Sequence, residues 1–327
     1  MTDPGGERSV LDNLPEDVEG ICKIVRNATI HHNLLGYYGL SAANRQIMAT
    51  VATPRVRDIL RTLSNTAPFG LYRDRLPIQR ILGACFMESH LLASLLRHQG
   101  YPVRIRAGYF RNVQNNLDHI TRFWTNALLA RRVDEDLLTK NPDEWKRAIE
   151  EFAEKQVSND HRIEHWICEY WDADLKDWRL IDANDVFLKA LCDLDVGFHL
   201  SADYFEYACD AWNAMRDNPY FNDDRYGEPP QTGRSHIRSQ LLSDFFSLLN
   251  HDLEYQRDTS SNLSGASFVK QRAYCEMSDF ELEELDKLAV VMSGDLSISD
   301  LTGFYKGART MQGTSIEQDP YCFIRNT

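Results

Sequence analysis

The sequence has few of the features that mark secreted, membrane-spanning or metal-stapled proteins. No run approaches the roughly 20 apolar residues that a membrane-spanning helix needs. The first seven residues hold no apolar run behind a basic start, so we expect no secretory signal. The seven cysteines are scattered without a Cys-x-x-Cys pair, which argues against a disulfide framework or a structural zinc site. Together these absences predict a reduced, cytoplasmic protein.

Basic residues are fewer than acidic ones. The chain has 36 Lys and Arg against 49 Asp and Glu, a formal net charge of −13. Because an acidic surface repels phosphate groups, neither nucleic acid nor an anionic membrane is expected as a partner. With 327 residues, 43% of them hydrophobic, the chain can bury a sizeable core, which excludes a disordered chain. The length predicts one large domain or two moderate ones.

Helical spacing dominates the first hundred residues. Residues 1–16 lack this spacing and predict a flexible tail, which ends at a helix-start signal. Apolar residues at i, i+3 and i+4 then predict three helices. The first begins near residue 18, the second covers about 42–64, and the third covers about 84–99. Gly100 and Pro102 are typical of a helix end, so the third helix should stop there.

Strand patterns follow in the middle of the chain. Alternating apolar and polar residues predict a strand at 103–110. Aromatic and β-branched residues at 165–172 and 178–182 flank a polar turn, which predicts a hairpin centred near 174–175. Helices are expected again over 204–215, 237–249 and 279–292. The predicted fold class is therefore α+β, with N-terminal helices, a small antiparallel sheet and a helical C-terminal part.

Composition also predicts the domain boundaries. One domain is expected over 17–255, with 111–160 as an insertion. The charged stretch 134–156 of this insertion predicts a helix that buries Trp145, Ile149 and Phe152. The polar run 256–266 predicts a linker, so 256–327 would be a linker and a small C-terminal extension packed on the core.

One cysteine lies at a predicted helix start. Cys85 follows Leu82-Gly83-Ala84. The partial positive charge and unpaired N–H groups of a helix N-terminus favour the thiolate, which is the nucleophilic form of cysteine. We interpret Gly83 as allowing a tight turn that exposes the sulfur. A single helix cysteine is more often a buried packing residue, so position alone leaves both roles open.

A histidine and an aspartate complete a possible triad. His165 opens one strand of the predicted hairpin and Asp182 closes the other, so the turn should bring them near one another. Cysteine, histidine and aspartate are the nucleophile, general base and orienting carboxylate of cysteine-based acyl chemistry. The candidate catalytic residues are therefore Cys85, His165 and Asp182.

Five segments carry a resemblance to a known family. They are Leu76–Cys85, Leu95–Arg104, Gly108–Phe110, His165–Trp171 and Trp178–Ala183. In this combination and order they resemble the transglutaminase-like superfamily, and more narrowly its bacterial transglutaminase-like domain proteins, over about 17–255. The resemblance implies a papain-like core as the catalytic domain, the Cys-His-Asp triad above, and acyl transfer to an amine or its hydrolytic reversal. Many relatives carry an acidic residue two positions after the cysteine, where this chain has Met87.

The predicted function is a cysteine-dependent acyltransferase that forms or exchanges an amide bond through an acyl-thioester enzyme, in a biosynthetic pathway for example. Its partners would be an acyl donor (a peptide, an amide or a carrier-protein thioester) and an amine acceptor. The triad needs no metal or organic cofactor, and the chain lacks the calcium-loop pattern D-x-[DN]-x-[DN]-G. A cysteine protease or amidase with the same triad, and a non-catalytic binding protein of the same fold, stay open as alternatives.

Three further residues are candidates for the substrate site. Trp166, next to the predicted base, can wall the site or pack the hairpin. Arg80 can bind a carboxylate or cap local carbonyls, and Glu169 shares a strand face with His165. Arg104 and Arg106 share a face of their strand, and we favour a structural salt bridge for them over a solvated or substrate-facing role.

Other polar patterns have competing interpretations. His161–His165 matches H-x-x-E-H, which on a helix holds zinc in a peptidase, but β-rich residues follow at once. We therefore expect no metal site there. His31 and His32 are expected to be a surface or packing pair, and Cys168 to be a core residue, since it lies on the strand face opposite His165.

Overall fold

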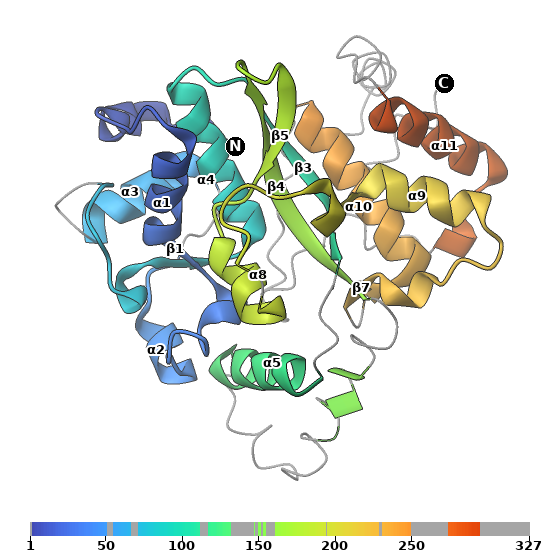
Figure 1. Ribbon diagram of the computed structural model, residues 1–327, viewed down its shortest axis with the longest axis horizontal. Helices are drawn as coiled ribbons and strands as arrows, with labels where there is room; N and C mark the ends of the chain where they lie inside the picture. The colour runs from blue at the N-terminus through green and yellow to red at the C-terminus, as the bar shows by residue number, and fades with distance from the viewer. Residues whose placement is uncertain are drawn as a thin grey trace. The chain divides into compact units, whose positions relative to one another are not determined.

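Figure 1 shows the computed structural model, which describes most of the chain. By their internal contacts the residues form two compact units. The described residues are 2–50, 55–66, 71–111, 117–131, 147, 150, 151, 153, 154, 161–193, 195–228, 231–249 and 274–294. Unit 1 comprises Met1–Ile105, Arg111–His161 and Trp166–Tyr204, and unit 2 comprises Arg106–Phe110, Arg162–His165 and Phe205–Thr327. Helices and a small antiparallel sheet make up most of the described residues, so the predicted α+β class is confirmed.

Unit 1 contains most of the helices. Its α-helices are α1 (Val18–Ala28), α2 (Ala42–Ile47), α3 (Val56–Thr66), α4 (Cys85–His98), α5 (Leu117–Arg131) and α8 (Asp185–Cys192). Its 3-10 helices are η1 (Gly5–Leu11), η2 (His32–Leu34), η3 (Pro77–Gln79) and η4 (Ala202–Tyr204). Helix α4 is the centre of this unit, because α1 and α3 pack on it and every residue from Phe86 to Leu96 is buried. A helix that is buried all round forms the core of its domain.

The strands that lie wholly or partly in unit 1 belong to two small sheets. A parallel pair joins β1 (Thr29–His31) to β2 (Ile81–Gly83). Antiparallel pairing joins β4 (Arg162–Asp172) to β5 (Asp177–Ile181), and β3 (Val103–Arg111) is the other neighbour of β4. The β4–β5 turn is tied by Asp172, whose Oδ1 accepts from the N–H groups of Asp174 (3.0 Å) and Leu175 (3.1 Å).

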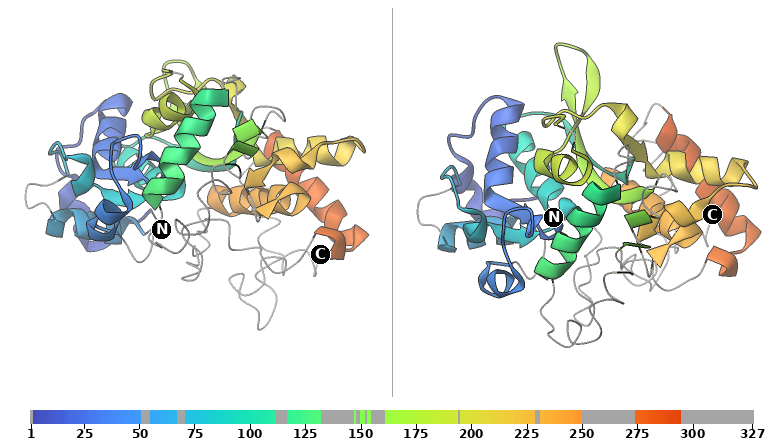
Figure 2. Two further views of the ribbon diagram at one scale, coloured as in Figure 1. Left: turned by 90° about the horizontal axis from the view of Figure 1, so that it is seen from below. Right: turned by 60° about the horizontal axis from the view of Figure 1, so that its bottom comes forward.

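Unit 2 is built mainly from three helices. Its elements are β6 (Phe205–Tyr207), α9 (Ala208–Asp217), η5 (Asp223–Arg225), β7 (Gly227–Glu228), β8 (Gln231–Thr232), α10 (Gly233–Leu248), η6 (Tyr274–Glu276) and α11 (Asp279–Ser293). Helix α9 packs on both α10 and α11 (Figure 2), and β6 pairs with the part of β3 that belongs to this unit. Apolar side chains from the three helices share one core, which includes Trp212, Phe245 and Leu285.

Several sequence predictions are confirmed by these elements. The helices expected near 18, at 84–99, at 237–249 and at 279–292 are α1, α4, α10 and α11. The strand at 103–110 is β3, and the hairpin turn is centred between residues 174 and 175, since Asp172 pairs with Asp177. Gly100 ends the turn after α4 with φ +89°, a conformation that glycine adopts most easily.

Other predictions need correction. The single helix expected at 42–64 is interrupted: α2 ends at Ile47 and α3 begins at Val56, with Pro54 between them, a residue that breaks helix interiors. The helix expected from 204 starts at Ala208, because Phe205–Tyr207 pairs with β3 as a strand. The tail expected at 1–16 contains η1, whose Leu11 is fully buried.

Two of the predicted segments fall mostly or wholly outside the described residues. The helix predicted at 134–156, with its three buried residues, falls outside the described residues, apart from a few positions. The linker predicted at 256–266 also lies outside them. Helix α11, which was assigned to the C-terminal extension, packs on α9 inside unit 2. In the part of the chain that is described, no helix has both the length and the apolar content to cross a membrane.

Candidate active site

Cys85 is the first residue of α4, as predicted. The preceding residue, Ala84, is the N-cap with extended backbone (φ −138°, ψ 170°), and the Cys85 side chain is partly exposed. Ala84 has no side-chain oxygen that could cap the helix. The thiol therefore sits where the helix dipole favours a negative charge.

Gly83 has a different role from the one predicted. It is the last residue of β2 and lies outside the positive-φ region, so it makes no tight turn. A Cβ at this position would meet Met87 Cε at 2.0 Å and Sδ at 2.8 Å. The absence of a side chain at 83 therefore makes room for Met87, which packs over the strand that leads to Cys85.

The strand before Cys85 is supported by a histidine pair. His31 and His32 are buried, with ring centroids 4.4 Å apart, and His32 Nδ1 lies 3.1 Å from the carbonyl oxygen of Gly83. The parallel pairing of β1 and β2 places His31 opposite Gly83. The prediction of a surface or packing pair is thus resolved in favour of packing.

Asp182 directly follows β5 in unit 1. It is 4% exposed, and its backbone N–H donates to the carbonyl of Phe198 at 2.9 Å. Its Oδ1 accepts a hydrogen bond from the backbone N–H of Asn184 at 2.8 Å, an Asx-type turn that fixes the carboxylate.

Glu88, which the sequence analysis did not assign, joins α4 to this turn. Asn184 Nδ2 donates to Glu88 Oε2 at 2.9 Å, and Thr29 Oγ1 donates to Glu88 Oε1 at 3.3 Å. Burial and, to a smaller extent, the nearby Asp182 carboxylate raise the pKa of Glu88 to about 8, against opposing effects of these hydrogen bonds and of Arg80. Glu88 is therefore mostly protonated near neutral pH.

His165 lies in the part of β4 that belongs to unit 2. The strand begins at Arg162, three residues before the predicted start, so His165 is its fourth residue. The imidazole is 1% exposed and stacks on Phe110 of β3, with ring centroids 3.9 Å apart and an interplanar angle of 19°. This stacking restrains the orientation of the ring.

Trp166, the residue after His165, belongs to unit 1 and packs on the first turns of α4. Its ring meets Phe86 edge to face at 4.7 Å, and its carbonyl accepts from Ser89 Oγ at 2.8 Å. The side chain is 6% exposed, which agrees with the packing role. Its assignment to substrate binding stays a prediction.

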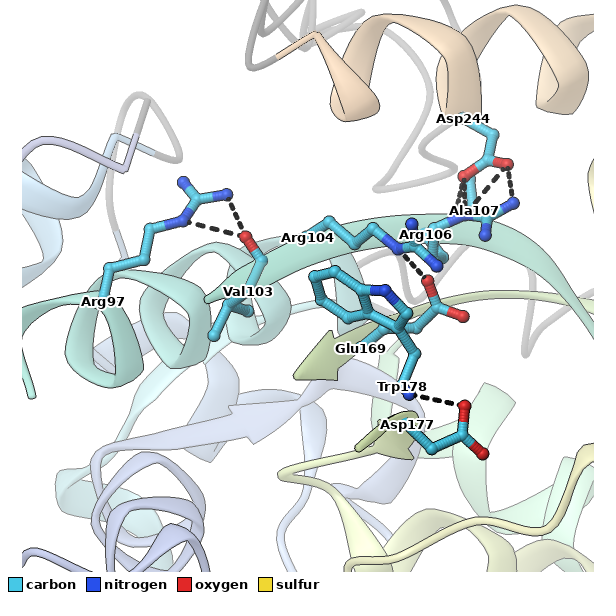
Figure 3. A network of polar contacts seen from close by, with 9 residues as sticks. All are labelled: Arg97, Val103, Arg104, Arg106, Ala107, Glu169, Asp177, Trp178 and Asp244. Carbon is cyan, nitrogen blue, oxygen red and sulfur yellow. Dashed lines mark hydrogen bonds and ion pairs between the residues drawn. The ribbon is translucent and has the colours of Figure 1, made fainter. Parts of the chain in front are cut away.

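The other two substrate candidates already have protein partners. Arg80 Nε donates to the carbonyl of Arg75 (3.4 Å), and its guanidinium lies 5.2 Å from the ring centroid of Tyr38, as the carbonyl-capping alternative predicted. The Glu169 carboxylate is buried and bound to Arg104, whose guanidinium also lies 4.0 Å from the ring centroid of Trp178 (Figure 3). Glu169 thus has a structural partner, so its substrate role is the weakest of the three.

The prediction of ion pairs for Arg104 and Arg106 is confirmed. In unit 2, Arg106 Nη2 lies 2.9 Å from Asp244 Oδ2, and both side chains are almost fully buried (Figure 3). Arg104 and Arg106 therefore serve the fold.

The zinc-peptidase pattern lies on the wrong kind of element. Arg162–His165 is strand, and the H-x-x-E-H zinc site requires a helix that places both histidines one turn apart. Within the described ranges, no three His, Cys, Asp or Glu side chains are grouped closely enough to hold a metal ion.

Cys85 also differs from the other described cysteines. Cys22, Cys168 and Cys209 are fully buried, and burial raises the pKa of each thiol, to about 12 for Cys209. The prediction that Cys168 is a core residue is confirmed; its Sγ lies 3.2 Å from the carbonyl of Ser89. Cys275 is exposed, which makes it an internal reference thiol.

No protein-family model, curated protein or solved structure matches this chain.

Proposed function

We propose that this chain is a cysteine-dependent acyltransferase that forms or exchanges an amide bond through an acyl-thioester on Cys85. The observation that carries the proposal is the hydrogen-bonded connection in unit 1 between the helix that starts at Cys85 and the Asp182 carboxylate, through Glu88 and Asn184. A packing cysteine would not need a buried polar connection to an aspartate at a strand end. A transglutaminase-like core, as the sequence motifs imply, is part of the proposal.

In the first half of the reaction, the Cys85 thiolate attacks the carbonyl carbon of the donor and a C–S bond forms. The carbonyl oxygen takes up the electron pair and is stabilised by backbone N–H donors at the helix start. When the tetrahedral intermediate collapses, the bond to the leaving group breaks and His165 donates a proton to that group. Asp182 orients the imidazole and stabilises its cation.

In the second half, His165 removes a proton from the incoming amine, whose nitrogen attacks the thioester carbonyl. The C–S bond breaks, Cys85 leaves as the thiolate, and the amide product is released. The net charge of −13 favours a cationic or neutral amine over an anionic one near the surface. If water takes the place of the amine, the same steps hydrolyse the donor.

The test is the intact mass of the protein after mixing with candidate donors: glutamine peptides, simple amides and carrier-protein thioesters. We expect the mass of one acyl group to appear on the wild type and on Cys275→Ser, the matched cysteine control, but not on Cys85→Ala. Full turnover by Cys85→Ala would contradict the proposal. Adding amines then separates the two outcomes, since amide product indicates transfer and free acid alone indicates the amidase alternative.

A further inference from the structure

We propose that Glu88 and Asn184 are positioning residues that fix the Asp182 carboxylate relative to the start of α4. The inference rests on the proposed function, because it assigns these two residues to the site of Cys85. Neither side chain is given a part in bond making or breaking.

The connection is continuous within unit 1. Glu88 is three residues after Cys85, so both project from the same side of α4. Glu88 Oε2 accepts from Asn184 Nδ2 (2.9 Å), and the backbone N–H of the same asparagine donates to Asp182 Oδ1 (2.8 Å). A third contact, from Thr29 of β1, holds the other oxygen of Glu88 (3.3 Å).

Burying these polar side chains costs free energy unless their hydrogen bonds are formed within the protein. Glu88, Asn184 and Asp182 are 3%, 5% and 4% exposed. A carboxyl group in such a place is tolerated when it is uncharged or hydrogen-bonded, and Glu88 is both near neutral pH. A leucine would fill the same position of a core helix at less cost, so the polar side chain points to a positioning role.

The charge state of Glu88 affects its surroundings. The groups that act on it are the Asp182 carboxylate, the Arg80 guanidinium and the uncharged Thr29 and Asn184. Cys85 lies about one turn earlier on the same helix. Protonated Glu88 adds no negative charge beside Asp182. Ionised Glu88 adds one, which disturbs the carboxylate that orients the proposed base.

The experiment measures the rate of Cys85 alkylation by iodoacetamide from pH 5 to 9.5, with Cys275 in the same molecule as the reference. The variants are Glu88→Leu, Asn184→Ala and Glu88→Gln, with Ser94→Ala as a control elsewhere on α4. Glutamine has the shape and hydrogen-bonding capacity of protonated glutamate. Alanine at 184 removes the side-chain donor but keeps the backbone N–H that binds Asp182.

We expect wild type, Ser94→Ala and Glu88→Gln to alkylate Cys85 about tenfold faster than Cys275 at pH 6, as an ion-paired thiolate does. In Glu88→Leu and Asn184→Ala the midpoint of the Cys85 profile should rise by about one pH unit, which lowers the rate at pH 6 about tenfold. Leucine and glutamine have similar volumes, so a defect in Glu88→Leu that is absent from Glu88→Gln reports the hydrogen bond to Asn184. A loss of core packing alone would not shift the pH midpoint of Cys85 while the Cys275 rate stays constant.

Two results overturn the inference in different ways. Fast alkylation of Cys85 that is unchanged in both Glu88→Leu and Asn184→Ala removes the positioning role and leaves the proposed function intact. Alkylation of wild-type Cys85 no faster than Cys275 at pH 6 overturns the proposed function and the positioning role together. If Glu88→Leu does not fold, as judged by circular dichroism, Asn184→Ala carries the same comparison.

Discussion

The buried ion pair in unit 2 gives the sharpest stability prediction. Asp244 Oδ1 and Oδ2 accept from Arg106 Nε (3.0 and 3.2 Å), Oδ2 also accepts from Nη2 (2.9 Å), and Oδ1 accepts from the Ala107 N–H (2.8 Å). The side chains are 3% and 0% exposed, and the Arg106 guanidinium lies 4.2 Å from the ring centroid of Tyr207. Asp244→Ala leaves the guanidinium charge buried without its carboxylate, so it should lower the free energy of unfolding by about 3–5 kcal/mol.

Urea unfolding followed by tryptophan fluorescence measures this change, since Trp212 lies in the core of unit 2. The double variant Arg106→Met/Asp244→Leu removes both charges, and we expect it to recover most of the loss. Asp195→Ala, which removes an exposed partner of Lys189 (2.8 Å), is the matched control and should leave the midpoint unchanged. A loss below about 1 kcal/mol in Asp244→Ala, or a double variant less stable than the single one, would refute the reasoning.

Two buried groups predict how stability depends on pH. Burial lowers the pKa of His236 to about 4, so between about 6.5 and 4 the unfolded chain binds a proton that the folded chain does not. Acid should therefore lower the free energy of unfolding of the wild type by up to about 3 kcal/mol more than that of His236→Phe. Urea unfolding at pH 7 and pH 4.5 measures both losses, and equal losses in the two proteins would contradict this. Glu88 changes stability in the opposite direction with pH. Its pKa is about 8 in the folded protein and near 4.5 in the unfolded chain, so the unfolded carboxyl loses its proton first as the pH rises, and the folded state loses stability. The free energy of unfolding of Glu88→Gln, relative to that of the wild type, should therefore be higher at pH 8 than at pH 4, by at most about 5 kcal/mol. Thermal melting of both proteins tests this, and a difference between them that does not change with pH would rule it out.

Local patterns predicted the elements next to the candidate site. The apolar stripe and the Gly100-Pro102 stop located α4, and the polar turn between aromatic runs located the β4–β5 hairpin, because these signals depend on a few neighbouring residues. Strand β6 was missed, since three residues that pair only with a distant strand carry no periodicity of their own.

The polar connections of the site were harder to predict. Glu88 was visible in the sequence as the residue one helical turn after Cys85, but its partner Asn184 is 96 residues away. The two-residue spacing from Asp182 to Asn184 is the signal that could have predicted the Asx-type turn. Glu169 was considered for substrate binding because its strand face was known, while its pairing with Arg104 depends on which strands are neighbours.

The division of strands β3 and β4 between the two units limits how the chain can be cut. The polypeptide passes from one unit to the other at five points, after residues 105, 110, 161, 165 and 204. A fragment that starts at Phe205 lacks the β3 segment that pairs with β6 and the arginine that neutralises Asp244. Neither unit can therefore be produced alone as one continuous segment, and cleavage of the chain after residue 204 would cut the covalent link between Phe205–Thr327 and the β3 and β4 segments of unit 2.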